Sequence, residues 1–99
     1  METSVTLRRL LLDVDKAVAR PSIVELARAI GAVAGVEAVN VTVSEIDIET
    51  VGMDVTVEGE AVDYEGVVEA IESTGAVVHS VDEVVVGSRT IECVERRRR

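Results

Sequence analysis

Two stretches of this chain share one layout: a helical pattern of apolar residues, then a glycine, then a valine-rich strand pattern. The first covers residues 22–49 and has Gly35 after its helical part, and the second covers residues 63–86 and has Gly75 in the same place. A further strand pattern precedes each helical pattern. The chain is therefore expected to form strand–helix–strand twice, with the two halves related by a pseudo-two-fold axis.

The first half is read as a strand over residues 4–14, a polar connection over 15–20, a helix over 22–34 and a strand over 36–49. Ser22 and Glu25 fit the S-x-x-E capping box that begins a helix, and Gly35 suits the position after its end. In the following strand the apolar phase changes between Val43 and Ile46. One extra residue near Ser44 and Glu45, a β-bulge, would explain that change.

The second half is read as a strand over residues 52–59, a helix over 63–74 that begins at the N-cap Asp63, and a strand over 76–86. A two-residue turn at residues 50–51 would join the second and third strands. That turn places Ile48 opposite Met53 and Ile46 opposite Val55, so the apolar faces match.

This element order predicts an α+β, ferredoxin-like βαββαβ sandwich. Right-handed crossovers give a four-stranded antiparallel sheet of order 4-1-3-2 with both helices on one face. We assign residues 1–90 to this single domain and residues 91–99 to a charged C-terminal tail, whose arginine run at residues 96–99 we expect to be mobile. The first and fourth strands carry apolar residues at positions of both parities, which predicts an apolar patch on the open face and hence a homo-oligomer.

Composition narrows the possible partners. The core must be aliphatic because the chain has no Phe or Trp, and Cys93 is the single cysteine, so no internal disulfide can form. The net charge is −9 although residues 96–99 are all arginine, which makes duplex nucleic acid an improbable partner because duplex binding needs a basic surface.

No leader and no apolar run of about 18 residues is present, so we expect a cytoplasmic protein that does not span a membrane.

Several segments resemble an uncharacterised archaeal family, domain of unknown function 211. They are residues 21–27 (PSIVELA), 35–42 (GVEAVNVT), 45–49 (EIDIE) and 79–84 (HSVDEV). The resemblance covers roughly residues 6–89 and does not include the arginine run. It implies a small cytoplasmic ferredoxin-like domain that assembles into homo-oligomers, and it implies no established activity.

An acidic ladder is the first candidate site. Glu45, Asp47 and Glu49 alternate along the second strand and therefore share a face. The register above places Asp54 opposite Asp47 and Thr56 opposite Glu45. Because like charges on facing positions repel and because Ca²⁺ and Mg²⁺ prefer carboxylate oxygens, we predict a divalent-cation site at Glu45, Asp47 and Asp54. The alternatives are a solvated, salt-adapted acidic face or a surface for a basic partner.

The second candidate is a ligand-binding group formed by Asp13, His79, Asp82 and Glu83. The expected strand order brings the end of the first strand near the start of the fourth, so Asp13 could orient the imidazole of His79. The alternative is a histidine that is only hydrogen-bonded within the sheet or at a subunit contact.

These patterns favour a non-catalytic oligomeric module, with a cation or small ligand held at subunit interfaces in a regulatory role. One rival function is an enzyme whose acid/base site, built from the same four residues, is assembled across subunits. The other rival is a structural scaffold without a ligand.

Overall fold

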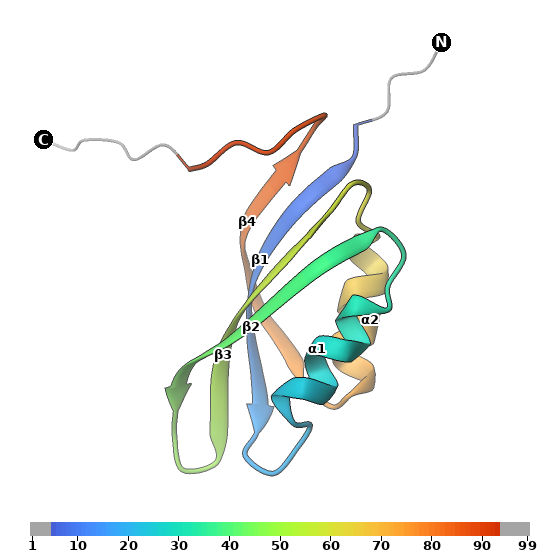
Figure 1. Cartoon of the computed structure of the whole chain (residues 1–99). Helices are drawn as coiled ribbons and strands as arrows, with labels where there is room; N and C mark the ends of the chain where they lie inside the picture. The colour runs from blue at the N-terminus through green and yellow to red at the C-terminus, as the bar shows by residue number, and fades with distance from the viewer. Residues whose placement is uncertain (1–4, 94–99) are drawn as a thin grey trace, which may run out of the picture.

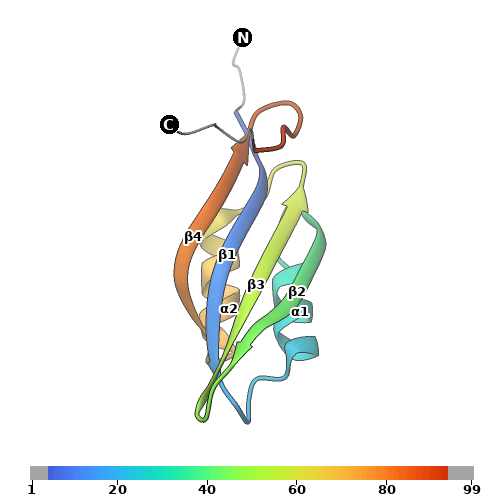
Figure 2. The ribbon, with the colours of Figure 1, turned by 90° about the vertical axis from the view of Figure 1, so that its left-hand side faces the viewer.

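The computed structural model describes residues 5–93 of the chain. Its elements, in chain order, are β1 (Leu7–Ala17), α1 (Ile23–Gly31), β2 (Val36–Ile46), β3 (Thr50–Gly59), α2 (Tyr64–Ser73) and β4 (Val77–Val86). The four strands form one antiparallel sheet of order β2-β3-β1-β4, and both helices cover the same face (Figures 1 and 2). The predicted ferredoxin-like fold and strand order are confirmed. The expectation of a mobile arginine run concerns residues that lie outside the described range.

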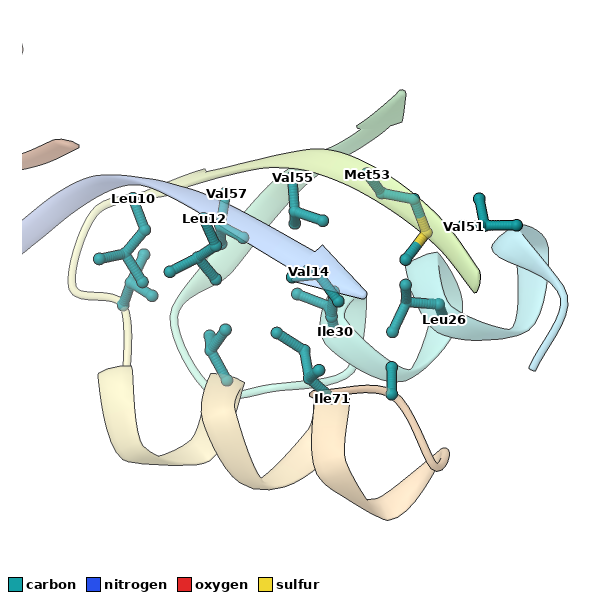
Figure 3. Packing of buried hydrophobic residues seen from close by; sticks show 13 residues of the cluster. Leu10, Leu12, Val14, Leu26, Ile30, Val51, Met53, Val55, Val57 and Ile71 are labelled. Atoms are coloured by element: carbon teal, nitrogen blue, oxygen red, sulfur yellow. The ribbon is translucent and has the colours of Figure 1, made fainter. Parts of the chain in front are cut away.

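The core lies between the two central strands and the helices (Figure 3). Successive side chains of a strand point to opposite faces, and every second residue of β1 and β3 faces the helices. These positions are aliphatic, and the buried side chains are Leu10, Leu12 and Val14 of β1, Val51, Met53, Val55 and Val57 of β3, Leu26 and Ile30 of α1, and Val67 and Ile71 of α2, with Val62 and Ala76 beside them. Burial of each large aliphatic side chain stabilises the fold by about 1.5–3 kcal/mol.

The first strand runs to Ala17, three residues past its predicted end. Lys16 continues the buried side of the strand after Val14, and only 8% of it is exposed. Its ammonium donates hydrogen bonds to the carbonyl oxygens of Ala17 (3.1 Å) and Val18 (3.2 Å), so its charged end is satisfied by backbone oxygens. The strand can therefore continue past Val14 with a lysine at a buried position. The aliphatic part of the Lys16 side chain packs against the core, and its ammonium group reaches polar atoms.

The helix starts agree with the sequence-based prediction, but one helix end does not. The Ser22 hydroxyl accepts a hydrogen bond from the Glu25 amide (3.0 Å), and the Asp63 carboxylate accepts one from the Gly66 amide (3.1 Å). However, α1 ends at Gly31 and not at residue 34. Gly35 has a positive φ of 83° and forms part of the turn into β2. Its Cβ, if present, would overlap the carbonyl oxygen of Ala61, so only glycine fits there.

The β2–β3 hairpin confirms the predicted bulge and corrects the predicted register. Val43 pairs with Met53 and Glu45 pairs with Gly52, so the extra residue on β2 is Ser44. Ile46 lies opposite Val51, whereas the predicted partners of Ile46 and Ile48 were Val55 and Met53. The turn is longer than predicted because β-branched Val51 is buried in the core and belongs to the strand.

Strand β4 contains two irregularities, which are extra residues that have no partner on β1. They are His79 and Asp82, and the register of β4 against β1 shifts at each of them. The sequence-based prediction, which assumed that side chains alternate regularly between the two faces, did not include these shifts. As a result Val78, Val81 and Val84, three residues apart, lie opposite Val14, Leu12 and Leu10 and all face the helix side. On the open face, Leu11 of β1 and Val77 and Val85 of β4 are the large apolar side chains of these two strands, and their neighbours Arg9, Asp13, Asp15, Ser80 and Glu83 are polar or charged, so the predicted continuous apolar patch is not found there.

We expect Gly35→Ala to be much more destabilising than Gly75→Ala. Both glycines have a positive φ, 83° and 101°, so alanine costs about 1–2 kcal/mol of backbone strain at either position. At Gly35 the new methyl group also overlaps the Ala61 carbonyl, whereas nothing lies within 4 Å at Gly75. Overpacking of this kind adds about 1–3 kcal/mol. Urea unfolding of the two variants measures the difference, and equal losses of stability would contradict the proposed loop contact.

Candidate functional site

The open face of the sheet brings one pair of predicted site residues together. Asp54 of β3 lies directly opposite Asp13 of β1. Thr42 of β2 lies on the other side of Asp54, and Ser80 of β4 lies on the other side of Asp13, so the four residues form one row across the sheet. Two carboxylates on facing positions of neighbouring strands repel each other by roughly 0.2–1 kcal/mol.

A second row lies next to the first. Glu45 and Asp15 flank Gly52 on its two sides, and a Cβ on Gly52 would lie 3.5 Å from Asp15 Oδ1 and 3.8 Å from Glu45 Cβ. The two acidic side chains therefore extend over the same face. We call Asp13, Asp15, Glu45 and Asp54 the acidic patch. His79 touches its border, with Nδ1 3.7 Å from Asp15 Oδ2.

Asp47 lies apart from the acidic patch. Its backbone amide donates to the Thr50 carbonyl (2.8 Å), and its carboxylate accepts a hydrogen bond from the Ile48 amide (2.9 Å), so it stabilises the hairpin turn. The predicted pairs Asp47–Asp54 and Glu45–Thr56 do not form, because Thr42 and Asn40 occupy the facing positions. Within residues 5–93, no three histidine, cysteine or acidic side chains are grouped closely enough to hold a metal ion.

The second predicted group is spread over several separate contacts. His79 contacts Asp15 and not Asp13, while Asp82 accepts a hydrogen bond from the Ser80 hydroxyl at 2.8 Å. Glu83 lies 3.5 Å from a guanidinium nitrogen of Arg9. A single chain therefore does not bring Asp13, His79, Asp82 and Glu83 into one pocket, and an acid/base site from these residues would require a second subunit.

Arg9 is a functional candidate that the sequence analysis did not single out. Its side chain is only 12% exposed and bonds Glu58 on β3 (2.8 Å) and, through two nitrogens, Glu92 of the C-terminal segment (3.2 and 3.0 Å). The hydrogen bonds that Arg9 donates to Glu92 and Glu58 raise the pKa of Arg9, and the guanidinium lowers the pKa of the Glu92 carboxyl. The sequence could have indicated this position, because successive side chains of a strand point to opposite faces and Arg9 directly precedes the core residue Leu10.

An apolar hollow on the helix side was also missed. Leu7, Leu10, Tyr64, Val81 and Val84 line a volume of about 320 Å³ between β4 and the start of α2. Val81 is 40% exposed and Val84 is 52% exposed, because α2 does not cover this part of the strand. The hollow depends on the two β4 irregularities, which turn Val81 and Val84 to the same face.

We expect Arg9→Gln to raise the pKa of Glu92 toward its ordinary value. The folded state then binds a proton on Glu92 more readily, and the contribution of the Arg9–Glu92 ion pair to the free energy of unfolding is lost. Because the Glu92 pKa is lowered from 4.5 in the parent protein, that contribution is present above about pH 4.5 and disappears as the pH falls below it. Carboxyl-detected NMR titration measures the pKa, with Arg28→Gln on α1 as the control. An unchanged Glu92 pKa in Arg9→Gln would contradict the ion pair.

Comparisons with known proteins identify the family of the chain. The chain matches the family model DUF211, described as "Uncharacterized ArCR", over residues 8–99. It is also 42% identical over 86 residues to uncharacterized protein MJ0319 of Methanocaldococcus jannaschii, an alignment that covers 87% of this chain and 88% of the relative. No helix within residues 5–93 is long and apolar enough to cross a membrane. The chain belongs to the DUF211 family, whose members include uncharacterised archaeal proteins.

Proposed function

We propose that this protein is a non-catalytic module that assembles with copies of itself through β4. The supporting observation is the apolar hollow, together with the neighbouring surface of Val86, which is 48% exposed. Apolar surface that a single chain leaves uncovered is typical of interaction sites. A small domain also gains from association, because it buries a modest fraction of its own surface.

The geometry of β4 favours contact through side chains over extension of the sheet. An edge strand can add another strand only where its outward amides and carbonyls keep a regular spacing. The irregularities at His79 and Asp82 interrupt that spacing. A second copy is therefore expected to cover the hollow beside Tyr64, and not to continue the hydrogen-bonded sheet.

Val84→Asp tests this assembly. The parent protein is expected to sediment as a species of several chains at micromolar concentration, and the variant as a monomer or with at least tenfold weaker association, because a carboxylate would be buried without a partner. Ile48→Asp is the matched control, since Ile48 is 90% exposed at the tip of the hairpin. A parent protein that remains monomeric in low and in molar salt would overturn the proposal.

A finer proposal is that the assembly binds a divalent cation or small ligand in a regulatory role. The observation that favours it is the facing pair Asp13 and Asp54, which replaces the predicted pair Asp47 and Asp54. A divalent cation between the two carboxylates would convert repulsion into attraction. Two side chains are too few for a complete site, so water or a second subunit would supply the other ligands.

Asp54→Asn tests the cation. It is expected to stabilise the metal-free protein by roughly 0.2–1 kcal/mol, because it removes the repulsion with Asp13. In the parent protein, Ca²⁺ or Mg²⁺ at about ten times its Kd should add about 1.4 kcal/mol relative to a monovalent control of equal ionic strength, and Asp54→Asn should cancel that gain. Asp47→Asn is the control, and it should keep the gain. Absence of a divalent effect in the parent would favour a scaffold without a ligand.

A further inference from the structure

We propose that residues 88–93, the segment that follows β4, form a strap over one end of the open face, and that this strap opens as a unit when the ion pair between Arg9 and Glu92 breaks. The segment belongs to no helix or strand. It leaves the end of β4 toward the side of the sheet that carries no helix (Figures 1 and 2). We call residues 88–93 the strap.

The burial of Val85 indicates what the strap covers. Val85 and Val77 lie on the open face near the two ends of β4, where they pair with Arg9 and Asp15 of β1. Val85 is 5% exposed and Val77 is 57% exposed, although neither faces a helix. The strap lies on this face at the Val85 end of the strand (Figure 2). We therefore attribute the burial of Val85 to the strap and to the Arg9 side chain beside it.

One end of the strap is fixed to the start of β1. The Gly87 amide donates a hydrogen bond to the Thr6 carbonyl (2.9 Å), and Arg8 Nε donates one to the Gly87 carbonyl (2.8 Å). Gly87 has a φ of 133°, a conformation that side chains disfavour, and nothing lies within 4 Å of the position that a Cβ would take there. Gly87 is thus the point where the chain turns out of the sheet, and the strap has room to move about it.

The other end of the strap is held by a single residue. Two guanidinium nitrogens of Arg9 donate hydrogen bonds to the Glu92 carboxylate (3.2 and 3.0 Å), and within residues 5–93 the strap makes no other hydrogen bond. Arg9 also bonds Glu58 (2.8 Å) and lies 3.5 Å from Glu83, so its guanidinium stays in place when Glu92 leaves. A segment with one tie and exposed backbone opens at low cost, because few contacts break together.

Opening the strap would change the chemistry of this end of the sheet. It would expose the apolar Val85 and leave Arg9 with two of its three carboxylate neighbours. A group that pairs with Arg9 or with Glu92 would therefore control access to Val85. The hollow proposed for assembly is lined by Val84, on the other side of β4, so the inference goes beyond the proposed assembly and does not rest on it.

Backbone ¹⁵N relaxation tests whether Arg9 holds the strap. The order parameters of Thr90, Ile91 and Glu92 are expected to be about 0.85 in the parent protein, as in rigid backbone, and to fall below about 0.6 in Glu92→Gln. Arg9→Gln, which removes the other partner, should lower them in the same way. Glu69→Gln removes one charge from an exposed position of α2 and should leave them unchanged. A flexible strap in the parent, or no change in Glu92→Gln, would overturn the inference.

The reactivity of an introduced thiol tests whether the strap covers Val85. In a Cys93→Ser background, Val85→Cys places a thiol under the strap, and Val77→Cys places one on the same face at the other end of β4. Adding Glu92→Gln should raise the rate at which the Val85→Cys thiol reacts with a disulfide reagent by about tenfold, because protection follows the closed fraction. The Val77→Cys thiol should react at the same rate with and without Glu92→Gln. Equal rates for Val85→Cys in the two backgrounds would overturn the inference.

The same two measurements on Val84→Asp separate the strap from assembly. This variant is expected to be monomeric, and it should still show a rigid strap and a protected Val85→Cys thiol. Loss of both in Val84→Asp would mean that a second chain covers Val85, and it would overturn the inference. A monomeric parent protein with a rigid strap would overturn the proposed assembly alone.

Discussion

The strict alternation of side chains along the two central strands is the constraint on which the rest of the molecule depends. In β1 and β3 one parity is apolar apart from Lys16 and packs on the helices, and the other parity is largely polar or charged and faces outward. Because the chain has no Phe or Trp, the core is filled by closely paired Leu, Val, Ile and Met side chains. A change of register by one residue would bury the aspartates and expose the leucines, so the same alternation that forms the core also forms the acidic patch.

Features that follow from local chemistry were predictable from the sequence. The helix caps at Ser22 and Asp63, the bulge at Ser44 and the strand order all follow from short patterns and known topology. The hairpin register was not predictable in the same way, because it depends on whether Val51 belongs to the turn or to the core. That decision is made by tertiary packing, and it changes the β2 partner of Asp54 from Asp47 to Thr42.

The irregularities of β4 had a larger effect on the site. A strand read without them assigns Val81 and Val84 to opposite faces, whereas the register shifts place both on the helix side. The apolar surface of the molecule is therefore at the edge of the sheet, and the open face is left to charged groups. Two surfaces of different chemistry result: an apolar surface at the edge of the sheet and an acidic surface on its open face. The proposed assembly and the proposed cation binding would therefore use different residues.

The position of the single aromatic residue has a practical consequence. Tyr64 begins α2 and lines the apolar hollow, and it is 38% exposed. The chain has no tryptophan, no phenylalanine and no other tyrosine. Its aromatic absorption near 280 nm and its intrinsic fluorescence therefore come from this one side chain. The fluorescence of the unmodified protein thus depends on the surroundings of one surface position. A molecule that binds in the hollow would change the emission of Tyr64.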